Sequence, residues 1–208
     1  MSLPPNAFDR VDEKPDALFY DTPRLVTHID ASTIAALSSY YSENLSPNSD
    51  VLDWMSSWVS HLPEDLPLDR VAGLGMNAEE LAANPRLSEF VVHDLNETPK
   101  LPFEDASFDV ALNAVSVQYL RRPLEVFSEI GRVLRPGGCS IVAMSHRCFP
   151  TKAIRAFHVP GAEERFRLVS HYHEQADAFD APTRIDRSPS PAEGTADPLW
   201  IVMAKKRA

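Results

Sequence analysis

Apolar residues in the middle of the chain follow first a strand-like and then a helix-like period. Residues 108–114 form a short apolar run that ends in small residues. The next apolar positions recur at spacings of three and four, as one buried helix face requires: Leu124, Phe127, Ile130 and Leu134. Pro136-Gly137-Gly138 stops that helix, and residues 140–144 are apolar again. We predict a right-handed parallel crossover, because helix-covered parallel strands are continuously apolar.

Shorter segments on both sides continue the alternation. Further strands are expected at residues 51–54, 70–74, 89–93, 183–187 and 199–205, and further helices at 77–84, 151–157 and 162–179. Asp30 or Ser32 can cap one more helix, which Pro47-Asn48 ends. Two prolines in residues 55–69 leave room for one or two helical turns. Asn77, followed three residues later by Glu80, resembles a capping box.

These elements predict an α/β fold with a doubly wound, mostly parallel seven-stranded sheet. A length of 208 residues suits one globular unit, in which residues 1–45 form an N-terminal arm and helix and residues 46–208 the α/β domain. Ligands of such sheets bind at the carboxyl ends of the strands. We therefore expect a site made of the loops that follow Asp53, Leu74 and His93, together with the end of the fourth strand at Asn113.

Charge and composition narrow the range of partners. A net charge of -10 without a concentrated basic face argues against binding to nucleic acid. The polar first residues lack the features of a secretory signal, and no apolar run is long enough to cross a bilayer, so we expect a cytoplasmic protein. Cys139 and Cys148 form no CxxC pair and are interpreted as structural thiols.

Four segments in order resemble the class I S-adenosylmethionine-dependent methyltransferases, in particular the methyltransferase type 11-like group: VLDWMSSW, VAGLGMN, VVHDLNETPKLPFEDASFDVALNAVSVQYL and EIGRVLRPGG. The resemblance covers roughly residues 50–145 and implies S-adenosyl-L-methionine as the cofactor. By the same resemblance, Asp53 is the acid that ends the first strand and Asp94 reads the adenine amine. The implied cofactor-binding residues are Asp53, Met55, Ser56, Ser57, Trp58, Gly75, Met76, Asn77, Asp94, Leu95, Asn113, Ala114 and Val115, the last three as the floor beneath the sulfonium.

Two departures from the family pattern lie in this region. The glycine positions of the family's D-x-G-x-G-x-G loop hold Met55, Ser57 and Val59, and Gly75 stands where the ribose carboxylate is expected. A charge-assisted hydrogen bond of this kind contributes about 1.5–3 kcal/mol. In one interpretation the loop is remodelled, with serine hydroxyls, a stacking face on Trp58, and Asn77 or Glu79 reaching the ribose. In the other the fold persists without its cofactor. The bulky set MSSWVSHL favours remodelling.

Methyl transfer is an in-line displacement that requires alignment, exclusion of water and sometimes a base. Candidate catalytic bases are His61 in the loop and His146 after the fifth strand, although each also suits an ordinary exposed or core-edge histidine. His171 and His173 lack a third ligand and are expected on a helix surface, so we predict no metal site. Candidate substrate or lid residues are Tyr20, Arg24, His28, Gln118 and Tyr119, for which core packing is the alternative.

The sequence thus favours a methyltransferase that acts on a small-molecule acceptor by in-line transfer. A methyltransferase-fold protein without catalytic activity, which binds a protein partner or another ligand, is the alternative. A nicotinamide-dependent dehydrogenase is excluded, because no G-x-G-x-x-G follows a strand. Residues 151–187, which carry acceptor specificity in the family, show no catalytic motif, so the acceptor is not identified and the oligomeric state is left open.

Overall fold

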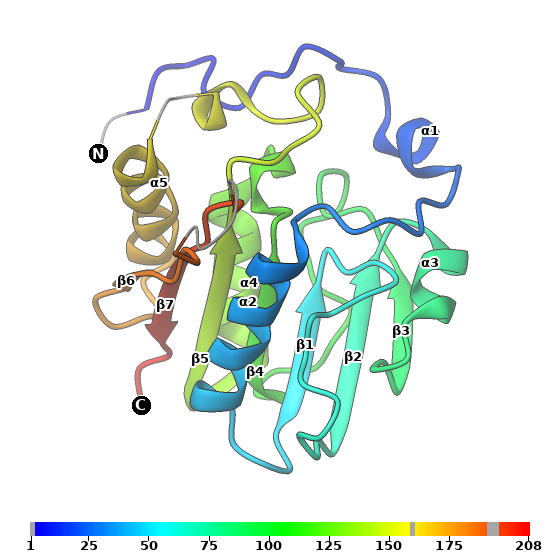
Figure 1. Ribbon diagram of the computed structural model, residues 1–208. Helices are drawn as coiled ribbons and strands as arrows, with labels where there is room; N and C mark the ends of the chain where they lie inside the picture. Colours follow the sequence, from blue (N-terminus) through cyan, green and yellow to red (C-terminus); the bar gives the residue numbers. More distant parts are fainter. Residues whose placement is uncertain (1–2, 159–160, 191–195) are drawn as a thin grey trace.

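The computed structural model describes residues 3–158, 161–190 and 196–208, and in these ranges seven strands form one sheet (Figure 1). The strands are β1 (Asp50–Trp54), β2 (Arg70–Gly75), β3 (Glu89–Val92), β4 (Phe108–Ala114), β5 (Leu134–Met144), β6 (Thr183–Asp186) and β7 (Trp200–Lys205). Their order is β3-β2-β1-β4-β5-β7-β6. β7 pairs antiparallel with β5 and β6, and the other neighbouring strands pair in parallel. The predicted fold class is confirmed.

Helices cover both faces of this sheet. The helices are α1 (Asp16–Tyr20), α2 (Ala31–Asn44), α3 (Ala78–Ala83), α4 (Pro123–Val133) and α5 (Ala162–Gln175), with short 3-10 turns at Val117–Tyr119 and Arg155–Phe157. Buried residues of α4 and α5 pack with one side of the strands, and those of α2 pack with the other. Asp30 caps α2, since its Oδ1 accepts a hydrogen bond from the Thr33 backbone N–H at 2.9 Å. No described helix is long and apolar enough to span a membrane.

The central crossover forms, but its buried helix face is rotated from the predicted one. Leu124 is 40% exposed, whereas Val126 and Val133 are fully buried beside Phe127 and Ile130. A spacing of three and four fits two neighbouring faces of α4, and packing against both the sheet and α5 selects between them. Leu134 already belongs to β5, which therefore begins before the Pro-Gly-Gly turn. Gly137 adopts the expected left-handed conformation with a φ of +78°.

The expected helical turns in residues 55–69 are absent. No helix is assigned in this segment, where Met55 and His61 adopt positive φ values of 56° and 57°. The expected helix at residues 151–157 is likewise reduced to a 3-10 turn. Prolines and left-handed residues interrupt the hydrogen-bond ladder that a helix requires. An irregular loop thus follows β1 where one or two helical turns were expected.

The N-terminal arm, residues 3–30, crosses the end of the molecule at which β1, β2 and β4 end (Figure 1). Backbone hydrogen bonds join it to the segment after β5, from Asp12 N to Thr151 O at 2.8 Å and from Arg155 N to Asp9 O at 2.9 Å. Ala156 N also donates to Ala7 O at 2.9 Å. The arm therefore covers the edge of the sheet at which ligands of doubly wound folds bind.

Candidate functional site

A pocket lies between the arm and the carboxyl ends of β1, β2, β3 and β4. It contains about 1080 Å³ of empty space, counted to its open mouth. The arm contributes Asp16, Tyr20, Arg24, Val26 and His28, and the strand ends and loops contribute Asp53, Met55, Ser56, Ser57, Trp58, Val59, His61, Gly75, Met76, Asn77, Glu80, His93, Asp94, Leu95, Asn96, Ala114, Val115, Ser116, Tyr119 and Phe149.

Most sequence-predicted site residues lie in this lining, but three do not. Asn113 is fully buried beneath the floor, where its Nδ2 donates to Trp54 O at 3.0 Å and to Ser116 Oγ at 2.8 Å. Gln118 is also buried, and its Nε2 donates to Val115 O at 2.7 Å. Both side-chain amides therefore stabilise the loop after β4 without lining the pocket.

His146 is the third such residue and was expected to point toward the acceptor. Its half-exposed ring lies outside the lining, with Nε2 at 3.1 Å from Asp197 Oδ1. Asp197 in turn accepts from Asp30 N at 3.0 Å, at the start of α2. His146 therefore lies at the junction of β5, β7 and α2, outside the pocket lining.

The loop after β1 lies directly against β2. The Ser56 backbone N–H donates to Leu74 O at 2.7 Å, and the Ser56 hydroxyl donates to the Asp53 carboxylate at 2.6 Å. Burial raises the pKa of Asp53 to about 6. Met55, at the first glycine position of the family loop, keeps a left-handed conformation without being glycine. A specific set of bonds therefore holds this loop in place.

Gly75 has no room for a side chain beneath that loop. A Cβ atom at residue 75 would lie 2.3 Å from the Ser56 carbonyl oxygen, a backbone atom, and 3.2 Å from Leu81 Cδ2. Any carboxylate at this position would have to displace the loop. The path of the loop after β1 and the absence of a carboxylate at residue 75 are therefore linked, because the loop backbone occupies the space that a side chain there would need.

Glu80 lies beside this contact and is buried. In the expected capping box its carboxylate would accept from the Asn77 backbone N–H, but it accepts instead from Ser57 Oγ at 2.5 Å and from the Arg24 backbone N–H at 2.7 Å. Asn77 still caps α3 through Oδ1, and its Nδ2 donates to Tyr20 O at 2.9 Å. The start of α3 thereby joins the loop after β1 to the arm.

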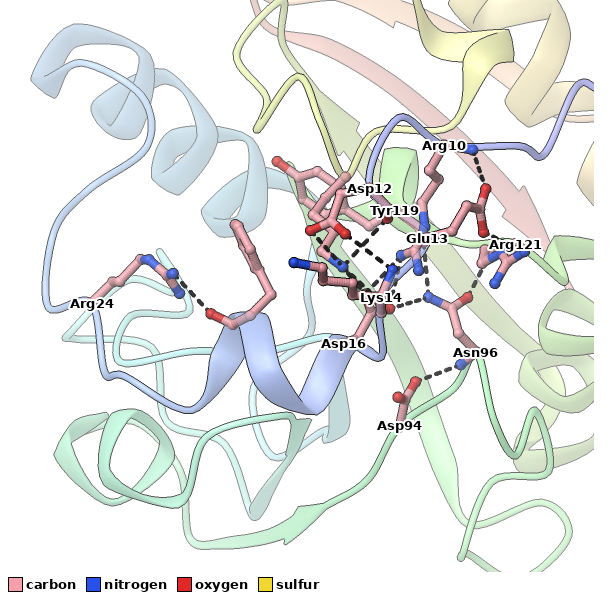
Figure 2. Close-up of polar contacts among 12 residues, drawn as sticks. Arg10, Asp12, Glu13, Lys14, Asp16, Arg24, Asp94, Asn96, Tyr119 and Arg121 are labelled. Carbon is pink, nitrogen blue, oxygen red and sulfur yellow. Dashed lines mark hydrogen bonds and ion pairs between the residues drawn. The ribbon is translucent and has the colours of Figure 1, made fainter.

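Buried charges anchor the arm over the adenine side of the predicted site (Figure 2). Asp16 accepts from Arg10 Nη1 at 2.8 Å and from Asn96 Nδ2 at 2.8 Å, and the fully buried Lys152 Nζ lies 3.2 Å away. Burial acts to raise the pKa of Asp16, but the hydrogen bonds from Arg10 and Asn96 outweigh it and hold that pKa below its usual value. The Asn96 backbone N–H donates to Asp94 Oδ1 at 2.8 Å, so the arm and the loop after β3 share one network.

The histidines differ in what surrounds them. His61 lines the pocket at 8% exposure, its Nδ1 has no hydrogen-bond partner, and burial lowers its pKa to about 4. His171 and His173 were expected on the helix surface but are both buried, and His173 lies 3.0 Å from Ser140 Oγ through Nε2. Among the described residues no group of three side chains could hold a metal ion.

Several lining residues were not predicted from the sequence, namely Asp16, Val26, Val59, Glu80, His93, Asn96, Ser116 and Phe149. Glu80 carried a signal, because it stands three residues after a capping asparagine, but that signal indicated a local role. Phe149 stacks on Tyr119 with ring centroids 5.8 Å apart, a contact between segments far apart in the sequence. No local pattern indicates such a contact.

Comparisons with known proteins agree with this geometry. Residues 56–142 match a family model described as "Methyltransferase domain". The chain is 35% identical over 71 residues to the biotin biosynthesis bifunctional protein BioHC of Teredinibacter turnerae, and 51% identical over 43 residues to the sterol 4-C-methyltransferase strm-1 of Caenorhabditis elegans. These matches cover 34% and 21% of this chain but only 12% and 13% of the relatives' own lengths.

A solved structure, that of the [4+2]-cyclase SpnF, has the same fold with a TM-score of 0.61. It is 18% identical, and the likeness covers 83% of this chain and 81% of that one. The family model spans the loop after β1 and continues through β2, β3 and β4 into β5, so it contains most of the pocket. This match shows that residues 56–142 are similar to a methyltransferase domain, and the shared sheet shows that the chain has the fold of that solved structure.

Proposed function

We propose that this protein transfers the methyl group of S-adenosylmethionine to a small-molecule acceptor in the pocket beneath the arm. The observation that carries the proposal is the continuity of the pocket. It runs from Asp53 past Gly75 to Asp94, over a floor of Ala114 and Val115, which is the path that the family resemblance implies for the cofactor.

The residues of the pocket fit this cofactor. Asp94 and Leu95 would hold the adenine, and the loop from Met55 to Trp58 would enclose the methionine part. The side chains at the former glycine positions do not close the space, since Met55 also packs against the core and the Ser57 hydroxyl turns to Glu80. When bound, S-adenosylmethionine supplies an electrophilic methyl group.

The chain's own residues align the reactants and exclude water. Tyr20, Arg24 and His28 reach the pocket from the arm, and the Arg24 guanidinium lies 4.5 Å from the centroid of the Phe19 ring. His61 is proposed as the base that takes the acceptor's proton because it lines the pocket in the loop after β1, and burial keeps its ring neutral at physiological pH. His146 lies outside the pocket lining and is not proposed as a base.

Calorimetric titration with S-adenosylmethionine and S-adenosylhomocysteine tests the proposal. We expect saturable binding in the micromolar range, typical of enzyme substrates. Asp94→Asn should weaken it, whereas Glu97→Gln, which changes an exposed carboxylate in the same loop, should leave it unchanged. Lack of binding at millimolar ligand would refute the proposal.

A second candidate function is binding of another ligand or partner without methyl transfer, as side chains at the three glycine positions would permit. Replacement of Met55, Ser57 and Val59 by glycine distinguishes the two. It should weaken S-adenosylhomocysteine binding if the loop is remodelled for the cofactor, because it removes the Ser57 bond to Glu80. Tighter binding by the glycine variant would favour a loop that has lost its cofactor.

A further inference from the structure

We propose that the carboxylate of Glu80 binds the ribose hydroxyls of the cofactor, in place of the carboxylate that the family carries at the end of the second strand. This inference rests on the proposed function. It assigns a binding role to a residue in the first turn of α3, whereas the family pattern places the carboxylate at the end of β2.

Sterics exclude the usual position. The Ser56 carbonyl oxygen would lie 2.3 Å from a Cβ atom on Gly75, and this loop is tied to β2 by the hydrogen bond from Ser56 N to Leu74 O. A ribose that lies over the end of β2 must therefore find its acceptor elsewhere. The nearest carboxylate in sequence that faces the pocket is Glu80.

The position of Glu80 fits this role. Glu80 is only 7% exposed but lines the pocket, so its carboxylate faces the ligand site and is shielded from bulk solvent. It also forgoes the capping-box bond to Asn77, which leaves the carboxylate turned toward the loop after β1 and the arm. A helix that needed only a cap would not require this orientation.

The other acidic groups that line the pocket lie on the arm or at the ends of other strands. Asp16 accepts from Arg10 and Asn96, and Asp53 accepts from Ser56 on the side of β1. Asp94 lies after β3, on the adenine side. The sequence suggested Asn77 or Glu79 for the ribose, but neither is available to it. The Asn77 amide is hydrogen-bonded to α3 and to the arm, and Glu79 is exposed and does not line this pocket.

The hydrogen-bonding capacity of Glu80 matches a vicinal diol. Each carboxylate oxygen already accepts one hydrogen bond, from the Ser57 hydroxyl and from the Arg24 N–H, and each retains capacity for another. Two adjacent hydroxyl groups supply two donors. The existing bonds orient the carboxylate before the ligand arrives, which lowers the cost of ordering it.

The same geometry couples the ligand to the arm. One oxygen of Glu80 bonds the loop after β1 and the other bonds Arg24, so a bound ribose would join a contact that already spans both segments. Binding should therefore hold the arm against the pocket.

Calorimetric titrations with S-adenosylhomocysteine, adenosine and 2′,3′-dideoxyadenosine test the inference. The wild-type protein should prefer adenosine to the dideoxy nucleoside by about 10- to 100-fold, the value of charge-assisted hydrogen bonds. Glu80→Gln should remove most of this preference and leave the affinity for dideoxyadenosine little changed. Glu79→Gln, the neighbouring exposed carboxylate, should behave as wild type.

The outcomes separate this inference from the proposed function. If wild-type protein binds none of the three ligands, the proposed function fails. If it binds S-adenosylhomocysteine but Glu80→Gln keeps the preference for adenosine, the cofactor site stands and the role of Glu80 is refuted. Equal loss for both nucleosides would show that Glu80 only holds the loop and the arm. Should Glu80→Gln not fold, Glu80→Asp decides, since it keeps the charge but withdraws the carboxylate from the ribose and must weaken adenosine selectively.

Discussion

Replacement of Gly75 by alanine tests whether the loop after β1 and the end of β2 form one rigid unit. The new Cβ atom would lie 2.3 Å from the Ser56 carbonyl oxygen, whereas ordinary van der Waals contact begins at 3.4 Å. The backbone of the loop must therefore move by about 1 Å, the difference between these two distances. Such a shift strains the bond from Ser56 N to Leu74 O and that from Ser56 Oγ to Asp53.

Overpacking costs about 1–3 kcal/mol, and strain in a buried hydrogen bond adds about 1 kcal/mol. We therefore expect Gly75→Ala to lower the free energy of unfolding by about 3 kcal/mol, which for a chain of this length lowers Tm by about 6–12 °C. Binding of S-adenosylhomocysteine should weaken as well, because the displaced loop lines the pocket.

Gly73→Ala is the matched control on the same strand. Its Cβ would meet Leu87 Cδ1 at 2.4 Å, which is an equally short distance but to the end of a flexible, partly buried side chain. Rotation of Leu87 relieves that contact, so the cost should be about 1 kcal/mol or less. Thermal and urea unfolding of the two variants measure the difference. Equal losses for both, or an unchanged Tm for Gly75→Ala, would refute the reasoning.

Three further predictions concern buried titratable groups. Burial raises the pKa of Asp53 to about 6, above its usual 3.8. Between pH 4 and 6 the folded protein therefore binds more protons than the unfolded chain, and it loses stability as the pH rises through this range. Asp53→Asn should flatten the dependence of the free energy of unfolding on pH, measured by urea unfolding, and an unchanged dependence would contradict this. Burial lowers the pKa of His173 to about 4, so stability should fall as the pH drops from 6.5 to 4. His173→Gln should reduce that loss in urea unfolding, and identical pH profiles for the variant and the wild type would exclude His173 as its source. Lys152→Met leaves the buried Asp16 with one fewer cation, so it should lower the free energy of unfolding by about 3 kcal/mol and speed proteolysis of the arm. Replacement of the exposed Lys14 by methionine should do neither. An arm that stays resistant to protease in Lys152→Met would show that Lys152 does not hold it.

Local patterns predicted the elements that build the sheet. The strand at residues 108–114 has the predicted bounds, Asp30 caps α2 and Asn77 caps α3, because periodicity and caps are properties of neighbouring residues. The resemblance likewise placed most of the pocket correctly, since the pocket follows the ends of those strands.

Only the tertiary structure decided which face of a helix is buried and which partner a polar side chain takes. Leu124 is exposed because it lies on the face of its helix that does not pack against the sheet or a neighbouring helix, whereas His173 lies on a packed face and is buried. Spacing along the chain does not specify which face packs. Glu80 had a local partner available in Asn77 but bonds Arg24, 56 residues away, and Ser57, 23 residues away. Periodicity reflects the geometry of one segment, whereas such contacts depend on which segments the fold brings together. The site is therefore completed by the arm and the loop, whose positions result from packing.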